Sequence, residues 1–175
     1  MRLLLTGSPG VGKTTVIRNI LKSIPGVQCA GFYSEERRES GQRRGFKICT
    51  LDGREAVLAT VSGVRGPRVA GYTVHVAEFE DLVLPRIDVD KTSADLYVID
   101  EIGRMELESP KFRNAVIELL ARPCNLLATV AKRGKGFLDQ IKGRNDIELI
   151  EVTKENRDQL AAETARKILS QIKSP

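Results

Sequence analysis

The feature that most constrains this sequence is a glycine-rich segment directly after the first apolar run. Leu3, Leu4 and Leu5 form a continuous apolar run, which is typical of a short strand buried on both faces. The G-x-x-x-x-G-K-[ST] pattern follows at once, as Gly7, Ser8, Pro9, Gly10, Val11, Gly12, Lys13 and Thr14. Residues 15–22 then carry apolar side chains at helical spacing. Strand, glycine loop and helix form the context in which this pattern binds phosphates.

Each residue type in this loop has a physical reason to be there. Glycines let the backbone approach phosphate oxygens without a Cβ in the way. Successive backbone N–H groups and the positive end of the following helix favour a polyanion. We expect Lys13 to bridge the β- and γ-phosphates and the Thr14 hydroxyl to ligate Mg²⁺, with Thr15 completing the nucleotide-binding segment. The motif therefore predicts nucleoside triphosphate binding, against the alternative of a glycine-rich turn that binds nothing.

Composition narrows the class of protein further. A chain of 175 residues with 41% hydrophobic residues suits one domain with a proper core, here residues 1–175. No run of about 18 apolar residues occurs, so we expect no membrane span. Cys29, Cys49 and Cys124 are isolated, which indicates reduced cysteines in a cytoplasmic protein. The net charge of +5 suits a phosphate-binding protein and is compatible with weak nucleic-acid binding.

Strand-like and helical segments alternate along the chain, which predicts an α/β fold with a mostly parallel sheet between two helical layers. The expected strands after the first are 27–33, 46–50, 55–60, 72–76, 96–99, 125–130 and 147–152. The expected later helices are 78–84, 110–121, 136–142 and 154–172. Pro85 is expected to end the helix before it, and residues 61–71 to form a loop. Asp52-Gly53 is a strong hairpin signal, so an antiparallel flap over about residues 34–76 interrupts the parallel core. His75 is expected to be structural.

The apolar strand Leu96-Tyr97-Val98-Ile99 delivers two acids, Asp100 and Glu101, to its carboxyl end. The carboxyl ends of parallel strands form the ligand-binding edge of such a sheet. Asp100 is in position to hold Mg²⁺, through water, opposite Thr14. Glu101 is placed to accept a proton from water lined up with the γ-phosphate, as a general base.

Thr129 ends another predicted strand at the same edge. Its hydroxyl would contact the γ-phosphate or the attacking water, or else the residue is there only because β-branching suits a strand. Phosphoryl transfer also needs a cation near the γ-phosphate, and Arg104 is the candidate closest in sequence to Glu101. Other candidate cations are Arg37, Arg38, Arg43, Arg44, Lys132 and Arg133, and the sequence does not choose among them.

Five segments, in this order and spacing, closely resemble the small P-loop nucleoside-triphosphatase family of thermophilic bacteria and archaea, which has a human cancer-related member. They are Gly7–Thr15, Gly31–Glu36, Arg44–Phe46, Asp100-Glu101-Ile102-Gly103-Arg104-Met105-Glu106-Leu107 and Val152–Arg157. The resemblance covers nearly the whole chain, and the fourth segment is its most specific part. Two departures are Arg104, where lysine is more usual, and Ala131-Lys132-Arg133, where a proline-containing sequence is expected.

The resemblance implies a RecA-like P-loop core with nucleotide-binding segments at Gly7–Thr14 and Leu96–Gly103. It also implies Mg²⁺-dependent hydrolysis of ATP, GTP, CTP, UTP and TTP to diphosphate and phosphate, with low base selectivity. The alternatives are a nucleoside or polynucleotide kinase and a nucleic-acid-binding switch driven by nucleoside triphosphate. A monomer is the default expectation.

Overall fold

In the computed structural model, which describes residues 1–172, the chain forms two compact units. We call the first the loop unit, because it contains the glycine-rich loop; it comprises residues 1–29, 94–102 and those from 124 on. The second, the hairpin unit, comprises residues 30–93 and 103–123, and so includes the residues predicted to form the flap. Each unit has its own strands and helices.

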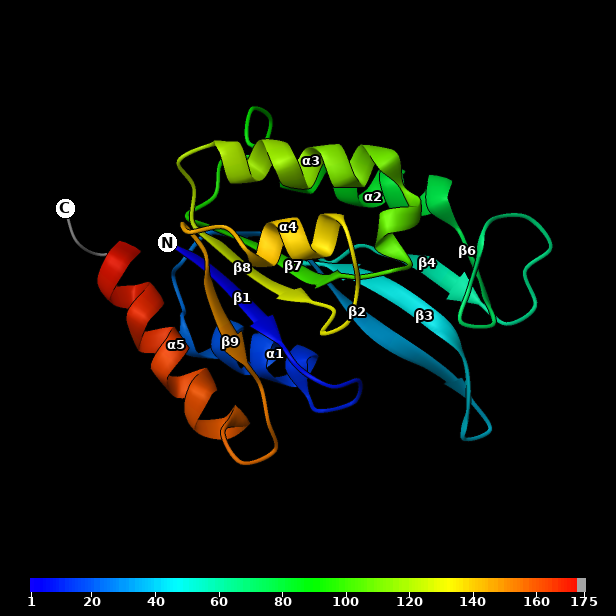
Figure 1. Ribbon diagram of the computed structural model, residues 1–175, viewed down its shortest axis with the longest axis horizontal. Coiled ribbons are helices and arrows are strands. Elements are labelled where there is room, and N and C mark those ends of the chain that lie inside the picture. Colours follow the sequence, from blue (N-terminus) through cyan, green and yellow to red (C-terminus); the bar gives the residue numbers. More distant parts are fainter. Residues whose placement is uncertain (173–175) are drawn as a thin grey trace. The chain divides into compact units, whose positions relative to one another are not determined.

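The loop unit contains four neighbouring parallel strands. They lie in the order β7 (Leu96–Ile102), β8 (Leu126–Val130), β1 (Arg2–Thr6) and β9 (Glu148–Glu151). The helices are α1 (Lys13–Ser23), α4 (Phe137–Lys142) and α5 (Arg157–Ile172). Figure 1 shows α1 and α5 side by side on one face of these strands and α4 on the other. Because the strands are parallel, all four end at the same edge.

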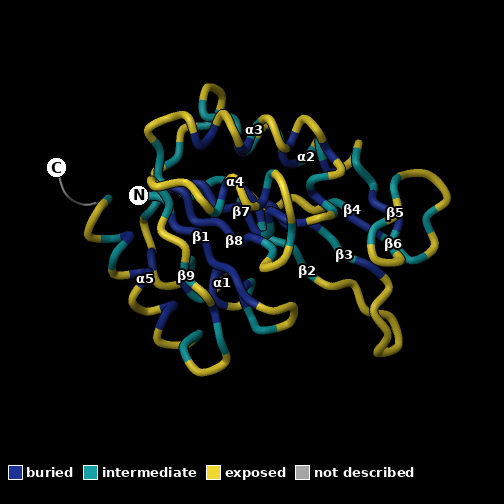
Figure 2. The backbone as a smooth tube through the Cα atoms, viewed as in Figure 1, coloured by how far each residue is buried: buried dark blue, intermediate teal, exposed yellow. Residues whose placement is uncertain are grey.

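The centre of this unit is formed by the apolar runs that the sequence presents. Leu3, Leu4 and Leu5 are each 0% exposed. Figure 2 shows β1 and β8 as buried along most of their length. A strand that is buried at successive residues has neighbours on both faces, which is why the run is continuous rather than alternating.

The hairpin unit is antiparallel. Its strands lie in the order β2 (Cys29–Glu39), β3 (Gln42–Thr50), β4 (Glu55–Thr60), β6 (Tyr72–Val74) and β5 (Arg68–Val69). Its helices are α2 (Val76–Ile87), the short 3₁₀ helix η1 (Glu106–Glu108) and α3 (Pro110–Ala121). Phe32, Phe79 and Phe112 meet edge to face, with ring centroids 5.1 to 6.0 Å apart. This aromatic cluster joins β2, α2 and α3 in one core.

Two expectations for this unit were wrong. The predicted strand 27–33 continues as β2 to Glu39, and its partner β3 begins at Gln42, because a tight turn at Ser40-Gly41 lets polar residues pair as an exposed ribbon. The predicted loop 61–71 contains the two-residue strand β5. β5 is an edge strand, and the end of the β2–β3 pair is exposed, so neither needs an apolar pattern.

The prediction that a helix ends before Pro85 was also wrong, because α2 continues to Ile87. Proline lacks the N–H that would bond to the Asp81 carbonyl in a regular helix, and side chains bond to two other carbonyl groups near this end of α2. Nη1 of Arg86 donates to the Leu82 carbonyl at 2.6 Å, and the Thr92 hydroxyl donates to the Pro85 carbonyl at 2.7 Å. His75, expected within a strand, instead precedes α2 as its N-cap, with Nε2 3.0 Å from the Thr60 hydroxyl.

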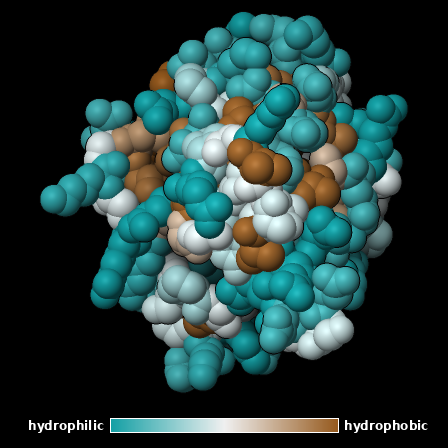
Figure 3. All heavy atoms as spheres, turned by 90° about the vertical axis from the view of Figure 1, so that its right-hand side faces the viewer, coloured by the Kyte–Doolittle hydropathy of each residue, from teal (hydrophilic) through white to brown (hydrophobic). Residues whose placement is uncertain are grey.

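The surface presents few large apolar side chains. Among residues 1–172, those exposed are Val64, Ile117 and Leu149, on three different elements or loops. On the face shown in Figure 3, hydrophobic side chains form separate spots among hydrophilic ones. Within the same residues, no helix combines the length and the apolar character needed to cross a bilayer.

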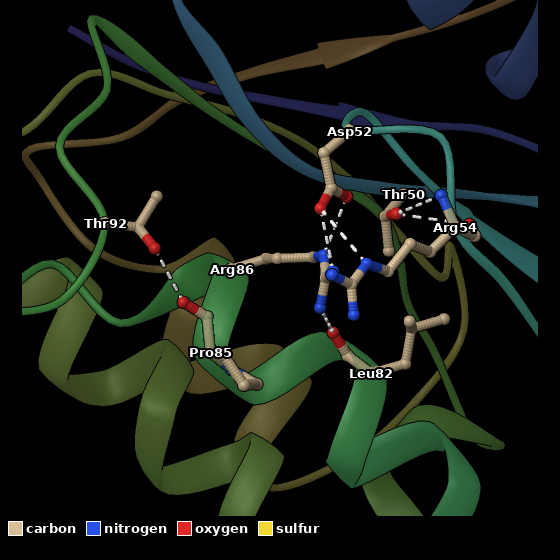
Figure 4. A network of polar contacts seen from close by, with 7 residues as sticks. All are labelled: Thr50, Asp52, Arg54, Leu82, Pro85, Arg86 and Thr92. Atoms are coloured by element: carbon tan, nitrogen blue, oxygen red, sulfur yellow. Dashed lines mark hydrogen bonds and ion pairs between the residues drawn. The ribbon is translucent and has the colours of Figure 1, made fainter.

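An ion pair fastens the β3–β4 turn to α2. Nε and Nη2 of Arg86 donate to the two carboxylate oxygens of Asp52 at 2.7 and 2.8 Å, and Figure 4 shows both side chains pointing toward each other. The Arg86 side chain is 15% exposed and that of Asp52 is 52% exposed. Hydrogen bonds from Arg86, and then from Thr50, lower the pKa of Asp52.

We expect Asp52→Asn to lower the free energy of unfolding by about 0.5 to 1 kcal/mol at pH 7, since the pair is half-exposed and screened by solvent. The lowered pKa means that this stabilisation is present above the unfolded-state value of about 3.9 and is lost as the pH falls through the folded-state value. Urea denaturation at pH 7 and at decreasing pH measures the difference. Asp81→Asn, at an exposed position of α2, is the control, and equal effects of the two variants at pH 7 contradict the prediction.

Candidate functional site

The glycine loop joins β1 to α1 at the carboxyl edge of the loop unit. The Val11 N–H donates to the Ser8 carbonyl at 3.2 Å, and the first helical bond runs from the Val16 N–H to the Gly12 carbonyl at 2.9 Å. Gly12 is the N-cap of α1 and has φ of 106°, in the region that favours glycine. A Cβ at Gly7 would lie 2.7 Å from the Val152 carbonyl oxygen, so that position has no room for a side chain.

The loop residues differ in exposure in the way a ligand-binding loop requires. Ser8, Pro9, Gly10 and Thr15 are exposed, Val11, Gly12 and Thr14 are half-buried, and Gly7 and Lys13 are buried. The loop is therefore exposed over Ser8–Gly10, whereas Lys13, the one charged residue of the motif, is 8% exposed.

Lys13 connects the loop to β7. Its ammonium nitrogen lies 3.4 Å from the Gly7 carbonyl oxygen and 3.3 Å from Oε2 of Glu101. A buried ammonium group needs such compensation, because removing it from water without a partner is costly. The ion pair places Glu101 directly beside the residue that the motif assigns to the β- and γ-phosphates.

Asp100, the residue before Glu101, is tied to the neighbouring strand. Asp100 is 1% exposed and Thr129 is 0% exposed, and the Thr129 hydroxyl donates to Oδ1 of Asp100 at 2.5 Å. The Thr129 hydroxyl therefore has a specific hydrogen-bond partner, the Asp100 carboxylate, so β-branching is not the only reason for a threonine at this position. Leu96, Tyr97, Val98, Ile99 and Ile102 are all buried. These apolar and aromatic side chains hold β7 in the core, and Asp100 and Glu101 are the two acidic residues near its carboxyl end.

Glu101 is electrostatically unusual. Burial raises its pKa, the positive charge of Lys13 opposes that rise, and the negative charge of Asp100 adds to it. Its side chain remains 29% exposed, so water reaches it. A carboxylate that is partly desolvated and still accessible to water has the character of a general base.

The candidate cations fall in different places. Arg104 is exposed and, like Gly103, belongs to the hairpin unit. Arg38 and Arg43 both pair with Glu36, and Arg44 lies 3.5 Å from Glu39. In the loop unit, Lys132 pairs with Glu151, and Arg133 is exposed. The catalytic roles of Arg104 and Thr129 remain predictions.

The structure also brings a segment to the loop that sequence reasoning did not place there. The Val152 carbonyl lies against Gly7, and Nη1 of Arg157 donates to the Val11 carbonyl at 3.4 Å. One indication was present in the sequence: residues 152–157 directly follow the last predicted strand, and segments that follow parallel strands lie at the ligand-binding edge of the sheet. Without the strand order, however, nothing indicates that this strand lies next to β1.

Comparison with known proteins gives the family. A family model described as NTPase matches residues 2–165. The nucleoside-triphosphatase THEP1 of Thermotoga sp. strain RQ2 is 40% identical over 163 residues, which span 93% of this chain and 92% of the relative. The human cancer-related nucleoside-triphosphatase is 41% identical over 174 residues, spanning 90% of this chain and 91% of the relative.

Two solved structures are similar along almost the whole chain. The crystal structure of THEP1 from the hyperthermophile Aquifex aeolicus has a TM-score of 0.85 and 33% identity, covering 99% of this chain and 100% of that one. The solution structure of a human cancer-related nucleoside triphosphatase has a TM-score of 0.80 and 39% identity, covering 97% of each chain. These matches confirm the α/β P-loop fold and the resemblance inferred from the motifs.

The Thr129–Asp100 hydrogen bond generates a prediction about stability. Thr129→Val keeps the side-chain volume but removes the donor to a buried carboxylate, so we expect the free energy of unfolding to fall by about 1 to 3 kcal/mol. Thr129→Ser keeps the hydroxyl group and loses one methyl group, and we expect a smaller loss. Urea denaturation of both variants provides the measurement. A serine variant less stable than the valine variant contradicts the proposed importance of this hydrogen bond.

Proposed function

The chain belongs to the NTPase family, and from that membership we propose that it is a Mg²⁺-dependent nucleoside triphosphatase. It hydrolyses ATP, GTP, CTP, UTP and TTP to the diphosphate and phosphate. The observation that carries this proposal is the Lys13–Glu101 pair, 3.3 Å apart. It puts a partly desolvated carboxylate beside the lysine of a phosphate-binding loop, where water can reach it.

Binding depends on the loop between Gly7 and Thr14. Its exposed backbone offers N–H donors to phosphate oxygens, and the start of α1 adds the positive end of the helix dipole. Lys13 supplies the positive charge for the β- and γ-phosphates. These contacts are to phosphates and not to a base, which supports low base selectivity.

Glu101 acts on water. Its carboxylate accepts a proton from a water molecule as the oxygen attacks the γ-phosphorus, and the bond from that phosphorus to the β–γ bridging oxygen breaks. Lys13 holds Glu101 and the phosphate chain next to each other. Asp100 is kept in place by Thr129, so the two acids at the end of β7 have separate tasks.

The donor set fits Mg²⁺. Thr14 offers a half-buried hydroxyl group next to Lys13, and Asp100 offers a buried carboxylate. Mg²⁺ prefers oxygen ligands and is usually held by one or two protein groups together with water and substrate phosphates. In residues 1–172 no cluster of three or more His, Cys, Asp or Glu side chains is suited to a metal ion, so Thr14 and Asp100 are the groups that would hold it. When bound, Mg²⁺ would neutralise charge developing on the β- and γ-phosphate oxygens.

We expect the purified protein to release phosphate from ATP, GTP, CTP, UTP and TTP in the presence of Mg²⁺ and without any added acceptor. Excess EDTA should abolish the release, and added Mg²⁺ should restore it. A phosphate assay with each nucleotide measures both effects. Phosphate transfer only when an acceptor hydroxyl compound is added would favour a kinase instead, and turnover that requires RNA or DNA would favour a nucleic-acid-dependent switch.

Two variants separate binding from chemistry. Glu101→Gln keeps the shape of the side chain but removes the base, so we expect kcat to fall by about 10²- to 10⁴-fold while nucleotide binding is retained. Lys13→Ala removes the cation of the loop, so we expect nucleotide binding itself to be lost. Phosphate release and equilibrium binding of ADP are measured side by side.

The matched control is Glu118→Gln, at an exposed position of α3, which should leave both quantities unchanged. Near-normal turnover in Glu101→Gln would remove Glu101 from the role of general base. Normal ADP affinity in Lys13→Ala would mean that the loop does not bind phosphates in the proposed way.

A further inference from the structure

The segment Val152–Arg157 lies against the glycine loop but has no role in the reaction described above. It begins where β9 ends, and β9 is parallel to β1 with Thr6 opposite Glu151. The Val152 N–H donates to the Thr6 carbonyl at 2.7 Å, and the carbonyl of Val152 is in contact with Gly7. The segment therefore starts at the same level of the sheet as the glycine loop.

Reciprocal hydrogen bonds fix the shape of this segment. The Thr153 N–H donates to Oδ1 of Asn156 at 2.8 Å, and the Asn156 N–H donates to the Thr153 hydroxyl at 3.3 Å. The Asn156 side-chain amide also donates to the Glu151 carbonyl at 2.8 Å. This arrangement has the geometry of a capping box. It holds Arg157, the first residue of α5, at a defined position.

The Arg157 side chain reaches the far end of the glycine loop. Nη1 donates to the Val11 carbonyl at 3.4 Å, and a Cβ at Gly12 would lie 3.3 Å from Nη1 and 3.5 Å from Cδ. The guanidinium group is thus packed on the loop backbone at Val11–Gly12, while the side chain stays 42% exposed. Its carboxylate neighbour, Asp158, is 3.9 Å away and 87% exposed, which makes a weak pair.

The strand order indicates which part of a nucleotide reaches Arg157. In the order β7-β8-β1-β9, Glu101 lies near the carboxyl end of β7, and the ammonium nitrogen of Lys13 is 3.3 Å from its carboxylate. The γ-phosphate end of the ligand therefore points toward the β7 side of the loop. The nucleoside extends in the opposite direction, past β1, and β9 with its following segment lies on that side.

We propose that Arg157 is a nucleotide-binding residue whose guanidinium plane stacks on the base; the proposal rests on the proposed function, because it assumes a nucleotide in this loop. A guanidinium group stacks on aromatic rings, and stacking accepts every base because every base has a π-face. The loop unit has two aromatic residues, Tyr97 and Phe137. Tyr97 is 3% exposed within β7, and Phe137 begins α4, so neither follows β9. Arg157 supplies the planar surface at the nucleoside end.

The test compares Arg157→Ala and Arg157→Lys by equilibrium binding of ADP, CDP and inorganic tripolyphosphate, each with Mg²⁺. We expect the alanine variant to bind both nucleotides about 5- to 100-fold more weakly, the range for one stacking contact, and to bind tripolyphosphate as the wild type does. The lysine variant keeps the charge but has no plane, so we expect it to behave like the alanine variant. In turnover, KM should rise while kcat changes little.

The control is Arg166→Ala, an exposed arginine on the same helix, which should leave all three affinities unchanged. Equal loss for nucleotides and tripolyphosphate, rescued by lysine, would overturn stacking in favour of a phosphate contact. Unchanged nucleotide affinity in Arg157→Ala would overturn the proposal outright. A loss of nucleotide affinity that is fully accounted for by unfolding of the variant, measured as its melting temperature, would also overturn it. Binding is measured without turnover, so a wild type that binds nucleotides but releases no phosphate refutes the proposed hydrolysis and leaves this test intact.

Discussion

The buried ammonium group of Lys13 is the constraint on which the rest of the site depends. A charge at 8% exposure requires compensation, and the Gly7 carbonyl and the Glu101 carboxylate supply it. The first partner fixes how the loop curves back on itself, and the second fixes the end of β7 beside the loop. In the proposed mechanism, the terminal phosphate of the ligand lies beside this ammonium group, with the Glu101 carboxylate next to it. Affinity and reactivity would then both depend on the same pair.

The register of the parallel strands places the other candidate site residues at one edge of the sheet. Leu5 of β1 lies opposite Thr129 of β8 and Ile150 of β9, so the segments that follow these strands begin at the same edge. The Thr129–Asp100 hydrogen bond, at 2.5 Å and fully buried, then ties β8 to β7 at this edge. Because this contact joins neighbouring strands, the position of Asp100 depends on the core, whereas Glu101 is held by Lys13 at the start of α1. This is the preorganisation that electrostatic stabilisation of a transition state requires.

The sequence predicted the parts of the fold that rest on burial and on short-range motifs. The strand at Leu3–Leu5 and the helix beginning at Pro110 were both correct, and the structure adds a Ser109 N-cap whose hydroxyl accepts from the Phe112 N–H at 2.9 Å. It failed at Pro85, where α2 continues to Ile87 although the proline was expected to end the helix. Nor did the sequence place Arg157 beside the loop, because only the pairing of β9 with β1 brings the segment Val152–Arg157 there.

The two glycines that frame the loop have a second reason to be glycine besides the ligand. At Gly7 a side chain would collide with the Val152 carbonyl, and at Gly12 it would press on Arg157. Both neighbours belong to the segment after β9, so this segment supports the loop at both Gly7 and Gly12. A polyanion then meets a loop whose shape is set before binding, which lowers the entropy that binding must overcome. If the backbone binds the phosphates and Arg157 stacks on the base, as proposed, the site is expected to favour a triphosphate strongly and to distinguish one base from another only weakly.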